Sequence, residues 1–427
     1  MISRLKKLLN EYPRTFWIII GGMFIDQLGG MLVFPFFGLY ITSKYGVGMT
    51  EVGVLFTIFA VTGVFGSFIG GAFTDKFGRK GIIIFGLVVS AASSLMLAFA
   101  PTLEFIYFAG AIVGLLGNLA GPAHQAMIAD ILPEDKRADG FGILRIIANL
   151  AVVIGPAIGG LLAARGYTLL FIIDVITSTI TGFIIFLFVP ETKPEKKPET
   201  VDQPIKEESI GEVIKGYLLV VKDQIYLVFV IGSLLYALAY MQMNTTLSVF
   251  LRDVHGIPDR GYGMLLSLNA AMVVLFQFWI TRRIKRFKPM KIMAWGMVIY
   301  AVGFSMYGFV STVIFFVIAM VIITIAEILV SPVSQAIVAK LSPEDMRGRY
   351  MAVYGFSWTI PTAIGPLAAG LIMDNYNPNW VWYAAGISML LSAGIFAYLQ
   401  AKAPKRFEQT EEELPEVEET ATAGSLS

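Results

Sequence analysis

The sequence contains no cysteine and few charged residues. Of its 427 residues only 15% are charged, against roughly 25% in an ordinary soluble protein. The absence of cysteine excludes a disulfide framework and thiol chemistry, and a net charge of +1 gives no general field for nucleic acid. The chain also lacks the G-x-x-x-x-G-K-[ST] loop of phosphate-binding ATPases, a Ser–His–Asp arrangement and metal-ligand spacing. We therefore expect neither an enzyme nor a bound cofactor.

Hydrophobic residues make up 56% of the chain and fall into about twelve segments near the ~20 residues that cross a bilayer. These segments are apolar all round, whereas the strands of a membrane barrel alternate apolar and polar positions. The first is too long for a signal-peptide core and has no small-residue cleavage site, so it is a retained span. The expected spans are 15–42, 50–72, 81–100, 103–130, 139–164, 167–189, 224–250, 261–283, 290–311, 313–339, 349–372 and 379–401.

Lysine and arginine predict the orientation of these spans. Of the 32 basic residues, about 27 fall in the N-terminus, the C-terminus and alternate loops. The loops between them hold only Lys44, Arg165, Arg252 and Arg260, and Arg145 lies within a span. By the positive-inside rule both termini are cytoplasmic, which requires an even number of spans.

The composition divides the chain into five parts. A linker rich in proline, lysine and glutamate separates two groups of six spans, and its second half could form an amphipathic helix. The acidic tail is poor in aromatic residues and is expected to be disordered. The parts are a cytoplasmic N-terminus at 1–14, a six-helix bundle at 15–189, a cytoplasmic linker at 190–222, a second six-helix bundle at 223–401 and the tail at 402–427.

The two halves repeat each other at a constant offset. GPAHQAMIADILPEDKR, from Gly121, aligns with SPVSQAIVAKLSPEDMR, from Ser331, and Gly155-Pro156 aligns with Gly365-Pro366, always 210 residues apart. Spans four and five therefore have counterparts of the same orientation in spans ten and eleven. Such parallel repeats predict two bundles with a transport site between them near the bilayer midplane.

The loop between spans two and three carries a motif, Gly71-Ala-Phe-Thr-Asp75-Lys76-Phe-Gly78-Arg79-Lys80. Glycine allows close helix approach and a tight turn at its two positions, and Asp75 can face a helix N-terminus. Arg79 can pair with a carboxylate such as Asp130. These cations could also serve only to set topology.

This motif resembles the cytoplasmic loop signature G-x-x-x-D-R/K-x-G-R-R/K of the major facilitator superfamily, and the resemblance covers about residues 15–401. It implies an all-α fold of twelve transmembrane helices in two six-helix bundles. In that family the loop latches the bundles in one state. The latch residues implied here are Gly71, Asp75, Gly78, Arg79, Lys80 and Asp130.

Span five carries a second motif, which is similar to the one associated with twelve-span drug:proton antiporters. Proline bends the helix, and glycines present a smooth face on which another helix can slide, although small residues also serve packing alone. The residues are Gly155, Pro156, Gly159 and Gly160, with Gly365 and Pro366 in the second half. Where that family often carries an arginine in span four this chain has Gly110, and Arg145 is the possible charge partner in its place.

Two carboxylates lie mid-span, Asp26 in span one and Glu327 in span ten. Charges inside a membrane are costly and are functional by default. In the family these spans line the central path, so both acids are expected to carry protons. A carboxyl that only hydrogen-bonds a neighbouring helix is the alternative. For Asp174 in span six we expect a structural or interfacial role, and for His124 a packed position at a helix end.

Aromatic, polar and methionine side chains in spans four and seven complete a predicted substrate pocket. Such residues suit greasy or cationic substrates, although a stripe of this kind can be plain packing. The predicted pocket residues are Asn118, Tyr236, Tyr240, Met243 and Asn244.

The sequence therefore predicts a secondary transporter that works by alternating access in the cell membrane, driven by a proton gradient. The resemblance favours antiport that exports amphipathic or cationic drug-like compounds. A proton-coupled importer or uniporter of a small polar solute, a lipid flippase and a non-transporting sensor remain alternatives. The expected partners are a small-molecule substrate, protons and the lipid bilayer, with no nucleic acid, and one chain should function as a monomer.

Overall fold

The computed structural model describes residues 11–117, 119–193, 210–284, 286–343 and 346–407. Every regular element in these ranges is helical. Twelve of the helical segments are long and apolar enough to cross a membrane. They coincide with the twelve predicted spans, with ends that differ by a few residues.

The first bundle contains six spans, two of which are broken. In the first span a short 3-10 turn begins where Pro35 lacks the N–H that would continue the α-helix. The fourth span is divided near residue 119. The elements are α2 (Arg14–Val33), η1 (Phe34–Phe36), α3 (Phe37–Tyr45), α4 (Met49–Phe77), α5 (Arg79–Ala98), α6 (Leu103–Gly117), α7 (Ala120–Ile131), α8 (Glu134–Ala163) and α9 (Thr168–Phe188).

The second bundle follows a helix of the linker. Its first span is interrupted at Thr246, at a level similar to the break in the first span of the chain. The elements are α10 (Ile210–Lys222), α11 (Gln224–Thr245), α12 (Leu247–His255), α13 (Asp259–Ile284), α14 (Pro289–Phe309), α15 (Val313–Leu341), α16 (Arg347–Asn375), α17 (Trp380–Lys402) and α18 (Pro404–Phe407).

The helix pairs that pack inside one bundle correspond to those inside the other. In the first bundle α2 packs on α8 and α9, α5 packs on α9, and α4 packs on α6. In the second, α11 packs on α16 and α17, α14 packs on α17, and α13 packs on α15. This correspondence confirms the parallel repeat inferred from the 210-residue offset.

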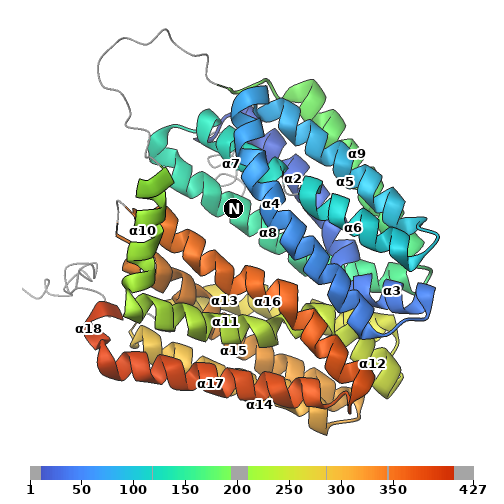
Figure 1. Cartoon of the computed structure of the whole chain (residues 1–427), viewed down its shortest axis with the longest axis vertical. Helices are drawn as coiled ribbons and strands as arrows, with labels where there is room; N and C mark the ends of the chain where they lie inside the picture. The colour runs from blue at the N-terminus through green and yellow to red at the C-terminus, as the bar shows by residue number, and fades with distance from the viewer. Residues whose placement is uncertain (1–10, 118, 194–209, 285, 344–345, 408–427) are drawn as a thin grey trace, which may run out of the picture.

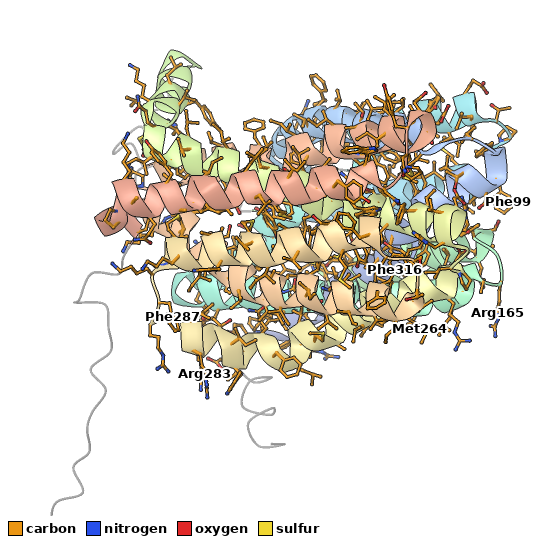
Figure 2. All side chains as sticks on the ribbon, turned by 90° about the horizontal axis from the view of Figure 1, so that it is seen from below. Phe99, Arg165, Met264, Arg283, Phe287 and Phe316 are labelled. Atoms are coloured by element: carbon orange, nitrogen blue, oxygen red, sulfur yellow. The ribbon has the colours of Figure 1, made fainter. Side chains whose placement is uncertain are left out.

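The bundles lie side by side and meet mainly through two helix pairs, α4 with α16 and α8 with α13 (Figure 1). The end that carries α3 and α12 lies opposite the end that carries α10 and α18. We call the former the outer end, following the orientation that the basic residues predict. Met264 on α13 points outward (Figure 2), and many other large apolar side chains along the helices are exposed, as expected of a surface that faces lipid.

Contacts between the bundles concentrate near the outer end. The Asp374 carboxylate at the end of α16 accepts the backbone N–H groups of Met49 and Thr50, at 2.9 and 2.7 Å. There it neutralises the positive N-terminus of α4. The Tyr167 hydroxyl donates to Asp259 across the other helix pair, at 2.6 Å. The outer end is therefore closed.

Candidate transport site

A cavity of about 690 Å³ lies in the first bundle and reaches the second at Thr362 of α16. This volume suits a drug-sized ligand. Its walls are mainly aromatic and aliphatic, with a group of polar side chains. The aromatic members are Phe34, Phe37, Phe56, Phe59 and Phe171, and the polar members include Asp26, Gln27, Ser90, Ser93, Ser94, His124 and Asp174.

Asp26 projects from α2 into this cavity, as expected of span one. Its Oδ1 accepts a hydrogen bond from the Ser178 hydroxyl of α9, at 2.7 Å. Ser178 lies 3.3 Å from the hydroxyl of Ser90 on α5, so three helices meet at this carboxyl. The contact fits either reading of Asp26, because a proton carrier and a structural acid both need a partner when buried.

Asp174 also lines the cavity, although the sequence suggested a structural role for it. The residue is only 6% exposed, and its carboxylate accepts a hydrogen bond from the Ser94 hydroxyl of α5. The charges of Asp26 and Asp174 repel each other, whereas His124 attracts the Asp26 carboxylate. The position of span six within the fold gave no sign of this arrangement.

Glu327 occupies a separate polar site in the second bundle and does not line the cavity. Tyr240 donates to one carboxylate oxygen at 3.0 Å, and the Asn269 amide donates to the other at 2.7 Å. The two tyrosines Tyr236 and Tyr240 pack against Tyr300 and Trp358. The structure thus places two of the predicted pocket residues around Glu327.

The other predicted pocket residues lie elsewhere or outside the described residues. Met243 is 2% exposed and packs in the core, Asn244 is half-buried, and neither lines the cavity. Asn118 lies outside the described residues, as do the side chains of Asp75 and Arg145. The roles given to these residues stay predictions.

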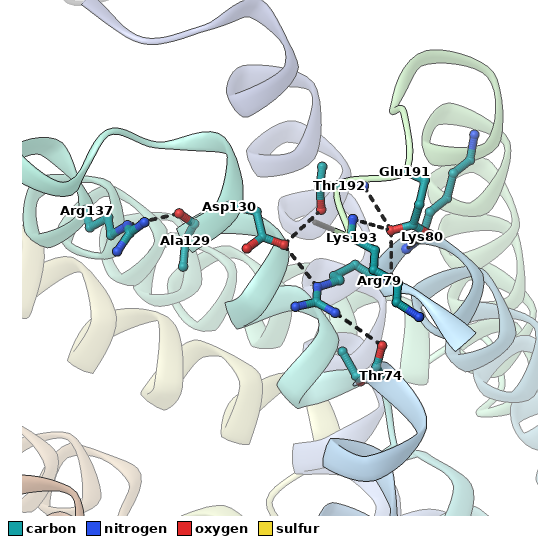
Figure 3. A network of polar contacts seen from close by, with 9 residues as sticks. All are labelled: Thr74, Arg79, Lys80, Ala129, Asp130, Arg137, Glu191, Thr192 and Lys193. Atoms are coloured by element: carbon teal, nitrogen blue, oxygen red, sulfur yellow. Dashed lines mark hydrogen bonds and ion pairs between the residues drawn. The ribbon is translucent and has the colours of Figure 1, made fainter. Parts of the chain in front are cut away.

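At the end opposite the outer end, Arg79 forms the ion pair that the loop motif predicted (Figure 3). Its Nε lies 3.0 Å from Oδ2 of Asp130 on α7, and its guanidinium also reaches the Thr74 carbonyl at 3.4 Å. Gly78, between α4 and α5, has a φ of 91°, a backbone conformation that favours glycine. The tight turn expected at Gly78 is therefore present, while Gly71 lies within α4.

Glu191 joins this cluster and was not foreseen from the sequence. Its carboxylate accepts the backbone N–H groups of Arg79, Lys80, Thr192 and Lys193 at 2.9 to 3.1 Å (Figure 3). Desolvation pushes the pKa of Glu191 upward, but these four donors outweigh it and hold the pKa below the ordinary value of glutamate. The start of the linker is thereby attached to the N-terminus of α5. Lys80 instead donates through Nζ to the Phe186 carbonyl, at 2.8 Å.

The glycines of the span-five motif pack against two different helices. A Cβ at Gly155 would lie 2.4 Å from Met31 Cβ, and one at Gly159 would lie 2.7 Å from Phe36, so both glycines face the first span. Pro156 lies inside α8, and a Cβ at Gly160 would lie 2.9 Å from the Cα of Gly263 on α13. The motif therefore serves one contact within the bundle and one between the bundles.

The second half repeats these contacts. A Cβ at Gly365 would lie 3.0 Å from Gln242 on α11, within the bundle, and Pro366 lies inside α16. A Cβ at Gly370 would lie 2.5 Å from the Met49 carbonyl of α4 in the other bundle. Gly53 of α4, 210 residues before Gly263, lies against Leu367. Glycines related by the repeat thus build both of the main inter-bundle contacts.

Twelve spans in two repeated bundles, with acidic side chains facing internal polar sites, define a two-bundle membrane transporter rather than an enzyme. The chain matches the sequence profile of the Major Facilitator Superfamily over residues 19–291 and 256–424. It therefore belongs to this superfamily, as its loop motif indicated.

Two relatives align with most of this chain. The chain is 29% identical to a Na(+), Li(+), K(+)/H(+) antiporter of Planococcus maritimus, over 92% of this chain and 95% of the relative. It is 24% identical to multidrug resistance protein MdtH of Shigella flexneri, over 90% and 92%. Antiporters and multidrug transporters are thus among its relatives.

Solved structures show the same fold. A peptide transporter POT in complex with sulfate superposes with a TM-score of 0.74 at 16% identity, over 93% of this chain and 96% of the other. The nucleoside transporter NupG gives a TM-score of 0.70 at 15% identity, over 93% and 100%. At these identities the likeness concerns the fold alone.

Proposed function

We propose that the protein is a proton-coupled antiporter that exports cationic amphipathic compounds. The observation that carries this proposal is the cavity in the first bundle, where Asp26 and Asp174 lie among five phenylalanines. Carboxylates attract a cation, and aromatic faces bind both its charge and its apolar body. A neutral or anionic substrate would gain no charge attraction from the acids.

Exchange follows if proton and substrate compete for the same carboxyls. A carboxyl that binds a proton on one side of the membrane loses its attraction for a cation, which can then leave. Glu327 provides a second protonation site in the other bundle, where its two hydrogen bonds keep the side chain in place. The gradient of protons across the membrane then drives the substrate outward.

Exchange of alkali cations for protons is a second candidate, favoured by one relative's name and by the oxygen-rich polar part of the cavity. Carboxylate and hydroxyl oxygens of Asp26, Ser178, Ser90 and Ser94 are suitable ligands for a hard cation. The aromatic walls do not contribute to such a site, which is why we place this candidate second.

Orientation and location belong to the same proposal. The basic residues support cytoplasmic termini in the cell membrane, and the two complete bundles support a monomer as the functional unit. The latch on the cytoplasmic side would then consist of Gly71, Asp75, Gly78, Arg79, Lys80 and Asp130, among which Arg79 pairs with Asp130.

The test is transport by the purified protein in proteoliposomes with an imposed pH gradient, using ethidium, a panel of neutral dyes, Na⁺ and K⁺. We expect the gradient to drive ethidium and not the neutral dyes. Gradient-driven movement of Na⁺ or K⁺ without ethidium would favour the second candidate. Import, lipid movement or a lack of any flux would support the importer, flippase or sensor instead.

Asp26→Asn and Glu327→Gln test the proposed carriers. Each change keeps the size and a hydrogen-bonding group while removing the ionisable carboxyl. We expect each to lower gradient-driven ethidium transport at least about tenfold, the scale expected when a positioned proton-transfer group is removed. Asp139→Asn, at an exposed acid of α8 outside the cavity, is the matched control. Full activity in both variants would remove these residues from the coupling.

A further inference from the structure

The two carboxyls of the cavity differ in origin but face the same space. Asp26 comes from α2 and Asp174 from α9, and both line the cavity. Each has one hydroxyl donor, Ser178 for Asp26 and Ser94 for Asp174. Each carboxyl is therefore held by a hydrogen bond from a serine on a neighbouring helix.

The packing of α2 on α9 leaves space for the Asp174 side chain. Gly29 lies directly opposite, and a Cβ at that position would come within 2.6 Å of the Asp174 carboxylate and 2.0 Å of the Thr177 hydroxyl oxygen. Any larger residue at position 29 would occupy the space that the carboxylate uses. The absence of a side chain at Gly29 thus lets an acid on an outer span reach the internal cavity.

The charges around the pair are few. His124 of α7 interacts electrostatically with Asp26, while α5 and α9 present serine hydroxyls. Among the side chains that the structure describes, no lysine or arginine pairs with either carboxyl. Two negative charges close together in an apolar cavity repel each other, so bound protons or a bound cation must offset the second charge.

We infer that Asp174 is the second exchange carboxyl of the cavity and determines how many protons leave for each cation that enters. This inference rests on the proposed antiport function. With Asp26 and Glu327 as the proposed proton carriers, Asp174 adds one proton to each exchange. A singly charged cation then replaces more protons than it carries charges, so the exchange is electrogenic. Removing the carboxyl of Asp174 lowers the proton count by one and reduces the net charge moved.

The experiment uses the full chain in proteoliposomes with ethidium as the monocation. A lumenal pH dye counts protons against ethidium taken up, and electrodes on a solid-supported membrane record net charge. We expect more than one proton per ethidium and a measurable current for the wild type. Asp174→Asn should reduce the ratio by about one proton and lower the current per ethidium moved, while ethidium transport continues.

Matched variants distinguish the effect of losing the Asp174 charge from an effect on folding. Asp139→Asn removes an exposed acid of α8 outside the cavity and should leave ratio and current unchanged, and Asp174→Glu should restore both. If Asp174→Asn does not yield a monodisperse protein, Asp174→Ser, which can still bond to Ser94, replaces it.

Two outcomes would overturn the inference. An electroneutral wild type that moves one proton per ethidium would show that only one carboxyl exchanges. An unchanged ratio and current in Asp174→Asn would show that this acid is structural. In both cases the wild type still couples to protons, whereas a wild type that ignores the pH gradient would instead overturn the proposed function.

Discussion

At the scale of single residues, Glu191 shows how charge attaches the linker to the first bundle. The residue is exposed, yet it accepts four backbone N–H groups, two of them from the first turn of α5. Helix N-termini favour an anion because their N–H groups lack partners within the helix. The linker therefore starts as a cap on α5, next to the Arg79–Asp130 pair.

Glu191→Gln should weaken this cap in a pH-dependent way. The pKa of Glu191 lies below its ordinary value in the folded protein, so the charged form stabilises the fold at pH above the unfolded value of about 4.3. That stabilisation is lost as the pH falls through the lower folded value. We expect Glu191→Gln to lower the Tm by about 2–4 °C near pH 7 and to match the wild type in strong acid.

Thermal unfolding of the detergent-purified proteins across pH measures this difference. Glu11→Gln, at another exposed glutamate of the chain, serves as control and should show no such gap. An equal Tm for both proteins near neutral pH would mean that the charge of Glu191 adds nothing to the stability. A difference in Tm that persists in acid would mean that the charge is not the cause of the stabilisation.

The residues that sequence analysis found and missed differ in a physical way. Arg79 and Asp130 could be paired because both belong to positions set by the loop motif and the end of span four, and the pair is present. Glu191 lies 112 residues from Arg79 in a segment whose composition resembles a linker. Asp174 reaches the cavity only because α2 has a glycine opposite it. Neither contact leaves a local pattern in the sequence.

At the scale of helices, the contact between the bundles depends on backbone approaching backbone. A Cβ at Gly263 would lie 2.8 Å from the Gly160 Cα, and one at Gly53 would lie 2.3 Å from the Leu367 Cα. Since main-chain atoms cannot rotate away as a flexible side chain can, a methyl group there has to separate the helices. The spans themselves were predictable from hydropathy, but this close approach depends on how the bundles dock.

Gly263→Ala should therefore open the outer end and impair transport. Because the chain has no cysteine, Arg165→Cys and Ser311→Cys, in outer loops of different bundles, can carry spin labels without background. We expect a longer distance between the labels in Gly263→Ala and a several-fold lower rate of ethidium transport.

Gly21→Ala is the matched control, since no atom lies within 4 Å of a Cβ at that position. It makes the same chemical change within a membrane helix and should leave both distance and rate unchanged. An unaltered distance in Gly263→Ala would show that the helices can absorb the methyl group, and that the glycine contact does not control closure.

At the scale of the whole molecule, the scaffold is symmetric and the chemistry is not. The repeat places equivalent helix pairs in both bundles and equivalent glycines at both contacts. The cavity with Asp26 and Asp174 belongs to the first bundle, whereas Glu327 lies in the second with its own partners. A symmetric scaffold lets the bundles rock about the midplane, and unequal chemistry lets proton and substrate bias that motion differently.

This division predicts that exchange and net transport respond differently to pH. In alternating access, the substrate-loaded protein can switch between its inward-open and outward-open states in both directions. Labelled ethidium should therefore exchange with unlabelled ethidium without proton movement. Net efflux also requires the empty protein to return, and the return needs protons on its acids to offset their charge. Raising the pH equally on both sides should thus slow net efflux about tenfold or more and leave exchange nearly unchanged.

Proteoliposomes loaded with labelled ethidium measure both fluxes in one preparation, with and without unlabelled ethidium outside. The passive leak of ethidium is measured with protein-free vesicles at each pH and subtracted. If the protein were a uniporter, the raised pH would slow neither flux, because the empty form returns without protons. A non-transporting sensor would show no flux of either kind. Equal slowing of exchange and net efflux would place the proton requirement in substrate binding itself, and the return step would lose its special role.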